Sequence, residues 1–224
     1  MPQLDRLPRA VIFDMDGLML DTEPLAARAW HDAAAALGVT FDHALTARLT
    51  GRNFVDCSVL IRMHYPADYP VDALLGGWHA AYDAIVARDG LVRKPGVLEL
   101  IAWLEARGIP RAVATSTRRD RAETKLAMTA LLPHFHALVG GDEVARGKPA
   151  PDIYLEAARR IATPPSQCLV LEDSEPGVRG ALAAGMTPIM VPDQLPPSPD
   201  LLAAEPLVEV SLHHVIARLA ALPR

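Results

Sequence analysis

Two aspartates near the start of the chain, Asp14 and Asp16, are spaced so that they could act together in catalysis. They follow the apolar run Ala10–Phe13, whose length and composition predict a short buried strand. If the alternation of a strand continues just past this run, both carboxylates point the same way. Two like charges at this separation need a metal ion, a shared proton or a cationic neighbour. Such a pair can bind a hard cation, and one member can act as a nucleophile.

Polar clusters follow two other predicted strands, and a lysine lies in a loop between strands. The clusters are Thr115–Thr117 and Glu172–Asp173, and the lysine is Lys148. Each cluster alone could be a helix cap, and Lys148 alone could be a surface residue. Because the carboxyl ends of parallel strands share one edge of a sheet, we expect all of them to converge near Asp14 and Asp16. Carboxylates, hydroxyls and one lysine together suit a phosphoryl group held by Mg²⁺.

The segments that position these residues alternate between strand and helix after residue 94. Apolar strands are predicted at 111–114, 137–139, 168–171 and 188–191, with helices at 97–107, 119–130, 151–161, 176–184 and 212–221. This order predicts an α/β fold with a parallel sheet and helices on both faces.

The stretch between the first strand and this alternating region reads differently. It contains no clear strand, and helices are predicted at 23–37, 42–49, 53–63 and 71–88. We therefore expect a catalytic core formed by residues 1–17 and 94–224, with an all-helical domain, residues 18–93, inserted into it.

Composition narrows the class of protein. The chain has 224 residues, of which 50% are hydrophobic, and a formal net charge of -5. This charge gives no electrostatic footprint for nucleic acid or an anionic membrane, and the longest apolar runs are far shorter than a bilayer span. The first residues lack the apolar stretch of a secretory signal. We expect a cytoplasmic protein, a monomer or weak dimer, with no disulfide between Cys57 and Cys168.

Four motifs, taken together and in this order, resemble those of the haloacid dehalogenase superfamily of phosphohydrolases. They are Phe13–Gly17, Ala114–Ser116, Gly147–Asp152 and Leu171–Gly177. The helical insertion resembles the cap of the subgroup that contains β-phosphoglucomutase and many sugar-phosphate and nucleotide phosphatases. The resemblance implies a three-layer Rossmann-like core with an inserted cap, which would close over the site, exclude water and select the substrate.

The resemblance also implies a role for each residue of the core motifs. Asp14 would attack phosphorus, and Asp16 would protonate the leaving oxygen and then activate water. Mg²⁺ would be held by Asp14, the Asp16 carbonyl and Asp173, with Glu172 either on the metal or one step removed from it. Phosphoryl oxygens would be bound by Thr115, the Ser116 N–H and Lys148. In the cap, the candidates for substrate contact are Glu23, Arg52, Asn53 and His79.

Departures from the pattern separate the possible reactions. Asp16 argues against dehalogenation, and the absence of lysine between Leu18 and Arg93 argues against phosphonate hydrolysis through a Schiff base. Ala26 and Arg28 stand where β-phosphoglucomutases carry a cap histidine, which disfavours a mutase. We therefore predict an Mg²⁺-dependent phosphatase that hydrolyses a small phosphorylated metabolite (a sugar phosphate, polyol phosphate or nucleotide) through an aspartyl phosphate. The alternatives are a β-phosphoglucomutase-like phosphomutase and, more distantly, a phospho-accepting signalling module.

Overall fold

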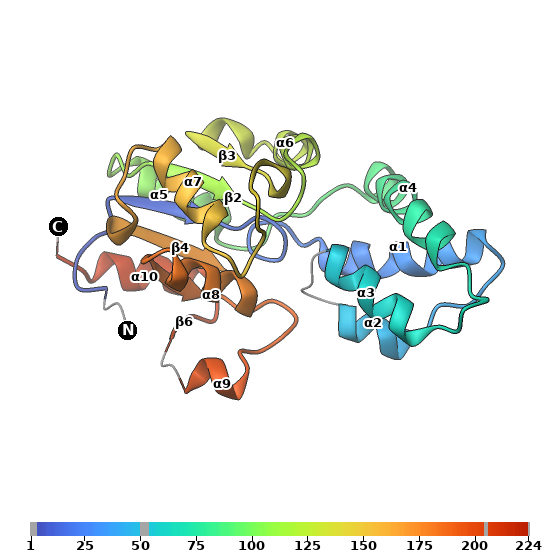
Figure 1. Cartoon of the computed structure of the whole chain (residues 1–224). Helices are drawn as coiled ribbons and strands as arrows, with labels where there is room; N and C mark the ends of the chain where they lie inside the picture. The colour runs from blue at the N-terminus through green and yellow to red at the C-terminus, as the bar shows by residue number, and fades with distance from the viewer. Residues whose placement is uncertain (1–3, 50–53, 204–205, 224) are drawn as a thin grey trace. The chain divides into compact units, whose positions relative to one another are not determined.

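The protein consists of two compact units, which we describe one at a time. The computed structural model describes residues 4–49, 54–203 and 206–223. Residues 1–20 and 93–224 form one unit, the core unit, and residues 21–92 form the other, the helical unit (Figure 1). The chain leaves the core unit after Leu20 and returns to it at Arg93.

The core unit is built on one parallel sheet. Within the described residues the sheet has six strands, in the order β3-β2-β1-β4-β5-β6. Their bounds are β1 (Ala10–Phe13), β2 (Arg111–Ala114), β3 (Ala137–Val139), β4 (Cys168–Glu172), β5 (Thr187–Met190) and β6 (Leu207–Val208). Phe13, the last residue of β1, pairs with Val113 on one side and Leu171 on the other. The carboxyl ends of the three middle strands therefore lie at nearly the same level.

Helices complete the core unit. They are α5 (Val97–Glu105), α6 (Arg119–Met128), α7 (Asp152–Arg160), α8 (Glu175–Ala183), α9 (Pro199–Leu202) and α10 (Leu212–Ala220), with 3₁₀ turns η1 (Leu132–His134), η2 (Gly141–Glu143) and η3 (Pro165–Gln167). Ala10 and Ile12 of β1 share one buried cluster with Tyr154 of α7 and Ala181 of α8. Because side chains alternate along a strand, Phe13 faces the other way, where its ring meets that of Phe135 edge-on at 5.4 Å. Apolar groups thus cover both faces of β1, which explains its unbroken apolar sequence.

The fold class is confirmed: the chain has the predicted parallel α/β core and an inserted all-helical segment. Two elements near the C-terminus were not predicted, the short helix α9 and the strand β6. β6 consists of two residues, of which Leu207 pairs with Ile189. A strand of this length carries no periodic signal in the sequence, so only pairing with a neighbour reveals it.

The helical unit has a hydrophobic core of its own. Its helices are α1 (Glu23–Ala36), α2 (His43–Leu49), α3 (Phe54–His64) and α4 (Val71–Asp89). Trp30 of α1 lies at the centre, with its ring 5.7 Å from that of Phe41, 6.0 Å from Phe54 and 5.1 Å from Trp78. Aromatic stacking of this kind adds to the stabilisation from burial alone and ties all of these segments to α1.

Each of the two cysteines is buried and free. Cys57 belongs to the helical unit and Cys168 to β4 of the core unit. Burial raises the pKa of the Cys168 thiol to about 11, which keeps it protonated and unreactive. Among the described residues, the structure contains no helix with the length and apolar character needed to cross a membrane.

We expect Ile12→Ala to lower the free energy of unfolding by about 2–5 kcal/mol, because it leaves a cavity between β1 and α7. Ile12 is fully buried, whereas Met128, at the end of α6, is 52% exposed. Met128→Ala is therefore the control and should change stability by no more than about 0.5 kcal/mol. Urea denaturation followed by circular dichroism measures both, and equal effects of the two variants would contradict this packing.

Candidate active site

The site begins where β1 ends and the chain turns sharply. The N–H of Asp14 donates to the Leu171 carbonyl at 3.0 Å, which extends the pairing with β4 by one residue. The turn then closes by a hydrogen bond from the Gly17 N–H to the Leu20 carbonyl at 2.9 Å. Gly17 has a φ of +86°, and a Cβ there would lie only 2.2 Å from a carboxylate oxygen of Asp173. Glycine is therefore required, and its absent side chain lets Asp173 lie against the turn.

Asp14 is buried against a lysine from a distant loop. The Lys148 ammonium donates to Oδ1 of Asp14 and, at 2.5 Å, to Oε1 of Glu172. The side chains of Asp14 and Lys148 are only 8% and 6% exposed, and Glu172 is fully buried. Burial raises the pKa of Asp14 to about 7, although Lys148 acts in the opposite direction. Burial would also lower the pKa of Lys148, but the charges of Asp14 and Glu172 hold it well above its ordinary value.

Glu172 uses both of its oxygens within the protein. Oε1 accepts from Lys148 and from the Tyr154 hydroxyl at 2.6 Å, while Oε2 accepts from the Ser174 N–H at 3.1 Å and hydroxyl at 2.9 Å. These four donors occupy the four lone-pair directions of a carboxylate. Both oxygens of Glu172 are therefore occupied by donors from the protein, and its contact with Lys148 fixes the position of that ammonium group.

The carboxylate of Asp16 contacts a different lysine, Lys125. The Thr117 hydroxyl donates to its Oδ2 at 2.7 Å, and the Lys125 ammonium donates to its Oδ1 at 2.7 Å. Lys125 was not predicted as a site residue, because a lysine in the middle of a polar helix is usually a surface residue. The signal that could have found it is its position in the second turn of α6. Helical side chains tilt toward the N-terminus of the helix, so a lysine at this position can reach back to the carboxyl end of the sheet.

The predicted phosphate-binding residues follow β2 directly. Thr115 is 1% exposed, its N–H donates to the Val139 carbonyl at 3.1 Å, and its Oγ1 accepts from the Thr117 N–H at 3.1 Å. This bond leaves the Thr115 hydroxyl hydrogen available to another acceptor. Ser116, the next residue, is exposed.

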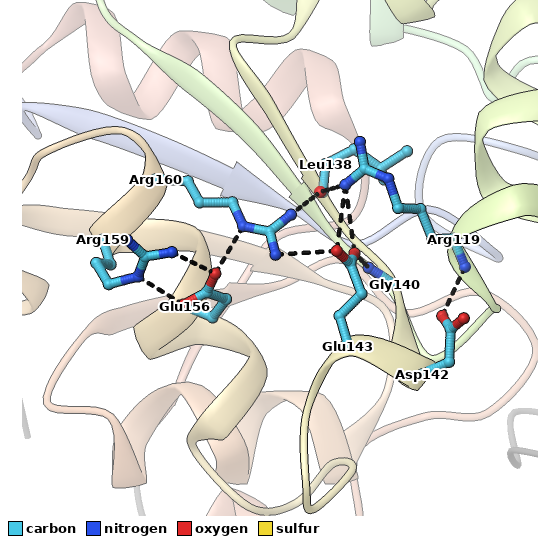
Figure 2. A network of polar contacts seen from close by, with 8 residues as sticks. All are labelled: Arg119, Leu138, Gly140, Asp142, Glu143, Glu156, Arg159 and Arg160. Atoms are coloured by element: carbon cyan, nitrogen blue, oxygen red, sulfur yellow. Dashed lines mark hydrogen bonds and ion pairs between the residues drawn. The ribbon is translucent and has the colours of Figure 1, made fainter.

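A network of charged side chains lies beside β3 and the turn that follows it (Figure 2). Two arginines, Arg119 of α6 and Arg160 of α7, donate to the Leu138 carbonyl at 2.7 and 2.8 Å. Glu143 lies between them, accepting from Arg160 at 2.9 Å and from the Gly140 N–H at 2.8 Å. Since β3 is an edge strand, these contacts satisfy backbone groups that would otherwise lack partners in the sheet.

The same network reaches the loop after β2, residues 115–117, through Gly140 and Gly141. The Gly141 N–H donates to the Thr117 carbonyl at 2.9 Å. A Cβ on Gly140 would lie 2.4 Å from the backbone nitrogen of Arg119, and one on Gly141 would lie 2.3 Å from the Ser116 carbonyl oxygen. The turn after β3 therefore packs directly on the loop after β2, which restricts how Thr115–Thr117 can move.

The structure brings together some of the predicted residues. Lys148 contacts both Asp14 and Glu172, Asp16 belongs to the turn after β1, and Asp173 lies against that turn. Of the candidates in the helical unit, Glu23 is partly buried, and the ring of His79 stacks on Phe54 at 4.8 Å, which is a packing contact. Arg52 and Asn53 lie outside the described residues.

Among the described residues no three His, Cys, Asp or Glu side chains form a ligand cluster. Asp14 begins the turn after β1 and Asp173 lies against that turn, so these two carboxylates could serve as oxygen donors to a metal ion. Mg²⁺ commonly binds through one or two carboxylates, keeping water and substrate phosphate as its other ligands.

The chain is similar in sequence to known proteins. A model of haloacid dehalogenase-like hydrolases matches residues 8–185. The chain is 35% identical over 181 residues to fructose-1-phosphate phosphatase YqaB of Escherichia coli, covering 81% of this chain and 95% of that protein. It is 33% identical over 190 residues to a bifunctional riboflavin kinase/FMN phosphatase of Arabidopsis thaliana, covering 84% of this chain but spanning only 50% of that longer protein.

A solved structure is similar as well. The crystal structure of CbbY from Rhodobacter sphaeroides in complex with phosphate superposes with a TM-score of 0.78 at 29% identity, covering 93% of this chain and 96% of that one. The likeness therefore extends over nearly the whole chain and is not confined to the sheet.

Gly177→Ala should lower the free energy of unfolding by about 1–3 kcal/mol through overpacking. A Cβ at Gly177 would lie 1.9 Å from the carboxyl group of Glu172, which is fully buried and has no room to move. Gly76 of α4 has nothing within 4 Å of such a Cβ, so Gly76→Ala should instead stabilise by about 0.5–1 kcal/mol. Chemical denaturation of both variants tests this, and a Gly177→Ala protein as stable as the parent would contradict it.

Glu143→Gln should destabilise the protein by about 1–2 kcal/mol at pH 7, and less in acid. Burial would raise the pKa of Glu143, but the Gly140 N–H and the Arg160 guanidinium lower it below its ordinary value. A carboxyl group with a lowered pKa stabilises the folded state above the ordinary value of 4.5 and loses that contribution as the pH falls through its folded value. Thermal unfolding between pH 7 and about pH 3 should show the variant and parent converging. Glu123→Gln, at an exposed glutamate of α6, is the control, and a pH-independent difference for Glu143→Gln would contradict this reading.

Proposed function

The chain belongs to the haloacid dehalogenase-like hydrolase family, and from this premise we propose that it is an Mg²⁺-dependent phosphatase of a small phosphorylated metabolite. The predicted superfamily is confirmed, and so is the predicted enzyme class at the level of the family. The metal, the covalent intermediate and the substrate belong to the proposal. The observation that carries it is the buried contact of Lys148 with Asp14 at the strand ends, with Asp16 beside it on a separate lysine.

In the first half of the reaction, Asp14 acts as the nucleophile. Its carboxylate oxygen attacks phosphorus, the bond from phosphorus to the ester oxygen breaks, and the electron pair of that bond goes to the departing oxygen. Asp16 gives this oxygen its proton, so an alcohol leaves and the phosphoryl group remains on Asp14. Lys148, the Thr115 hydroxyl and the Ser116 N–H are the groups we assign to the phosphoryl oxygens, where charge must be stabilised.

In the second half, each aspartate does the opposite of what it did in the first: Asp14 is the leaving group and Asp16 is the base. The oxygen of a water molecule attacks phosphorus while Asp16, now ionised, takes one proton of that water. The bond from phosphorus to the Asp14 oxygen breaks, and its electron pair returns to the Asp14 carboxylate. Inorganic phosphate leaves, and Asp16 again carries the proton that it needs for the next substrate. Protons and charges therefore balance over one cycle with no further reactant than water.

We assign the magnesium ion to Asp14, the Asp16 carbonyl and Asp173. The position of Asp173 against Gly17 supports this, because it sets a third carboxylate beside the turn that carries the other two. When bound, Mg²⁺ would neutralise part of the phosphoryl charge and reduce its repulsion from Asp14. Glu172 serves this site indirectly, by keeping Lys148 in place.

The helical unit is the part of the chain to which we assign substrate choice, as a cap domain. The candidate substrates are sugar phosphates, polyol phosphates and nucleotides, and relatives named for fructose 1-phosphate and FMN fall within these classes. Glu23 and His79 remain candidates for substrate contact, as do Arg52 and Asn53. The proposal also includes a cytoplasmic location and a monomer or weak dimer.

Asp14→Asn should reduce hydrolysis of p-nitrophenyl phosphate by about 10⁴-fold or more, because an amide oxygen is a poor nucleophile. Removal of divalent cations with EDTA should also abolish activity, and added Mg²⁺ should restore it. Glu123→Gln is the folded, active control. Retained turnover in Asp14→Asn or in EDTA would contradict the proposal.

Incubation with β-glucose 1-phosphate and a trace of the bisphosphate separates a phosphatase from the phosphomutase alternative. The proposal expects release of free phosphate in proportion to substrate consumed. Formation of glucose 6-phosphate without free phosphate would instead identify a mutase.

A further inference from the structure

The carboxylate of Asp16 is held at both of its oxygens by one short segment of chain. Thr117, just after β2, donates to Oδ2, and Lys125 of α6 donates to Oδ1, each at 2.7 Å. An ammonium donor on one oxygen and a hydroxyl donor on the other fix both the position and the plane of the carboxylate. Without them, Asp16 could rotate about its side-chain bonds, since its side chain is 24% exposed.

Lys125 is placed where a surface lysine would not be. Its side chain is only 12% exposed, so its ammonium has given up much of its contact with water. Such burial is costly unless the charge meets an opposite one, and here it meets Asp16. The helix that carries it is anchored as well, because the Thr129 carbonyl just after α6 accepts from Arg93 at 3.0 Å. The helix that carries Lys125 is therefore held in place where this lysine contacts Asp16.

Asp14 and Asp16 form ion pairs with two different lysines. Lys148 contacts Asp14 and Glu172, whereas Lys125 contacts Asp16. Two carboxylates separated by a single residue would otherwise compete for one ammonium group. Separate lysines keep Asp14 in its buried position and draw Asp16 toward α6, so the two side chains can do different work.

We propose that Lys125 is a positioning residue that holds the Asp16 carboxylate where it takes the proton of the attacking water. This inference rests on the proposed function, since it assigns Lys125 to the second half of that reaction. In that half, the water oxygen bonds to phosphorus, its proton goes to Asp16, and the bond from phosphorus to Asp14 breaks. A base displaced by about 1 Å can slow such a step by about 10²-fold.

The two halves of the reaction depend on Asp16 to different degrees when the leaving group is weakly basic. p-Nitrophenolate departs without needing a proton, so formation of the phosphoenzyme from p-nitrophenyl phosphate does not require Asp16. Breakdown of the phosphoenzyme always requires water activation. Loss of Lys125 should therefore slow breakdown selectively with this substrate.

The test compares Lys125→Met with the parent protein by rapid-quench kinetics. Lys125→Met should lower kcat by about 10- to 100-fold and lower KM in proportion, leaving kcat/KM within about 3-fold. It should also release p-nitrophenolate in a burst of about one equivalent and accumulate phosphoenzyme visible by intact mass. Lys125→Arg should recover most of the rate, because it restores a cationic donor. Glu123→Gln, which removes a charge from an exposed position of the same helix, is the control and should behave as the parent.

Thr117→Val gives a second, independent variant, because it removes the donor to the other oxygen of Asp16 without deleting a charge. It should show the same pattern to a smaller degree, and it applies even if Lys125→Met fails to fold. Equal losses of kcat and kcat/KM in these variants, or unchanged kinetics, would overturn the inference while parent turnover continued to support the proposed function. A parent protein with neither turnover nor phosphoenzyme would refute the proposed function and this inference with it.

Discussion

The contact between Lys148 and Asp14 is the interaction on which the rest of the site depends. A carboxylate buried at the end of β1 is stable only with a compensating charge, and Lys148 is held for that purpose by Glu172, which is itself fixed by Tyr154 and Ser174. The sheet makes this possible, because β1 and β4 are paired so that Asp14 and Glu172 emerge at adjacent positions. The burial of Asp14, its contact with Lys148 and the support of Lys148 by Glu172 therefore all follow from the pairing of β1 with β4.

The elements on both sides of β1 help to hold the site residues in position. Toward β4, the absence of side chains at Gly17 and Gly177 leaves room for Asp173 and Glu172. Toward β3, the arginine–glutamate network of Figure 2 covers the edge strand and restrains the loop after β2. In the reaction we propose, these groups must be held in place before substrate arrives if they are to stabilise developing charge, and buried hydrogen bonds hold them.

Much of this could be predicted from the sequence, for a physical reason. Unbroken apolar runs such as Cys168–Leu171 mark strands covered on both faces, and the polar residues after them must lie at the sheet edge. What could not be predicted depends on contacts between distant elements. Lys125 is an ordinary helical lysine until the position of Asp16 is known, and the donors that occupy Glu172 come from α7 and from the turn after β4. The strand β6 is too short to show a pattern of its own.

We propose that Asp14, and not a neighbouring residue, receives the phosphoryl group. Quenching the protein in acid during turnover of p-nitrophenyl phosphate, digesting it and locating the phosphate by peptide mass spectrometry tests this most directly. We expect a base-labile phosphate on the peptide that contains Asp14, assigned to that residue and absent when substrate is omitted. A phosphate on any other side chain, or steady turnover with no phosphoenzyme at any time after mixing, would contradict it.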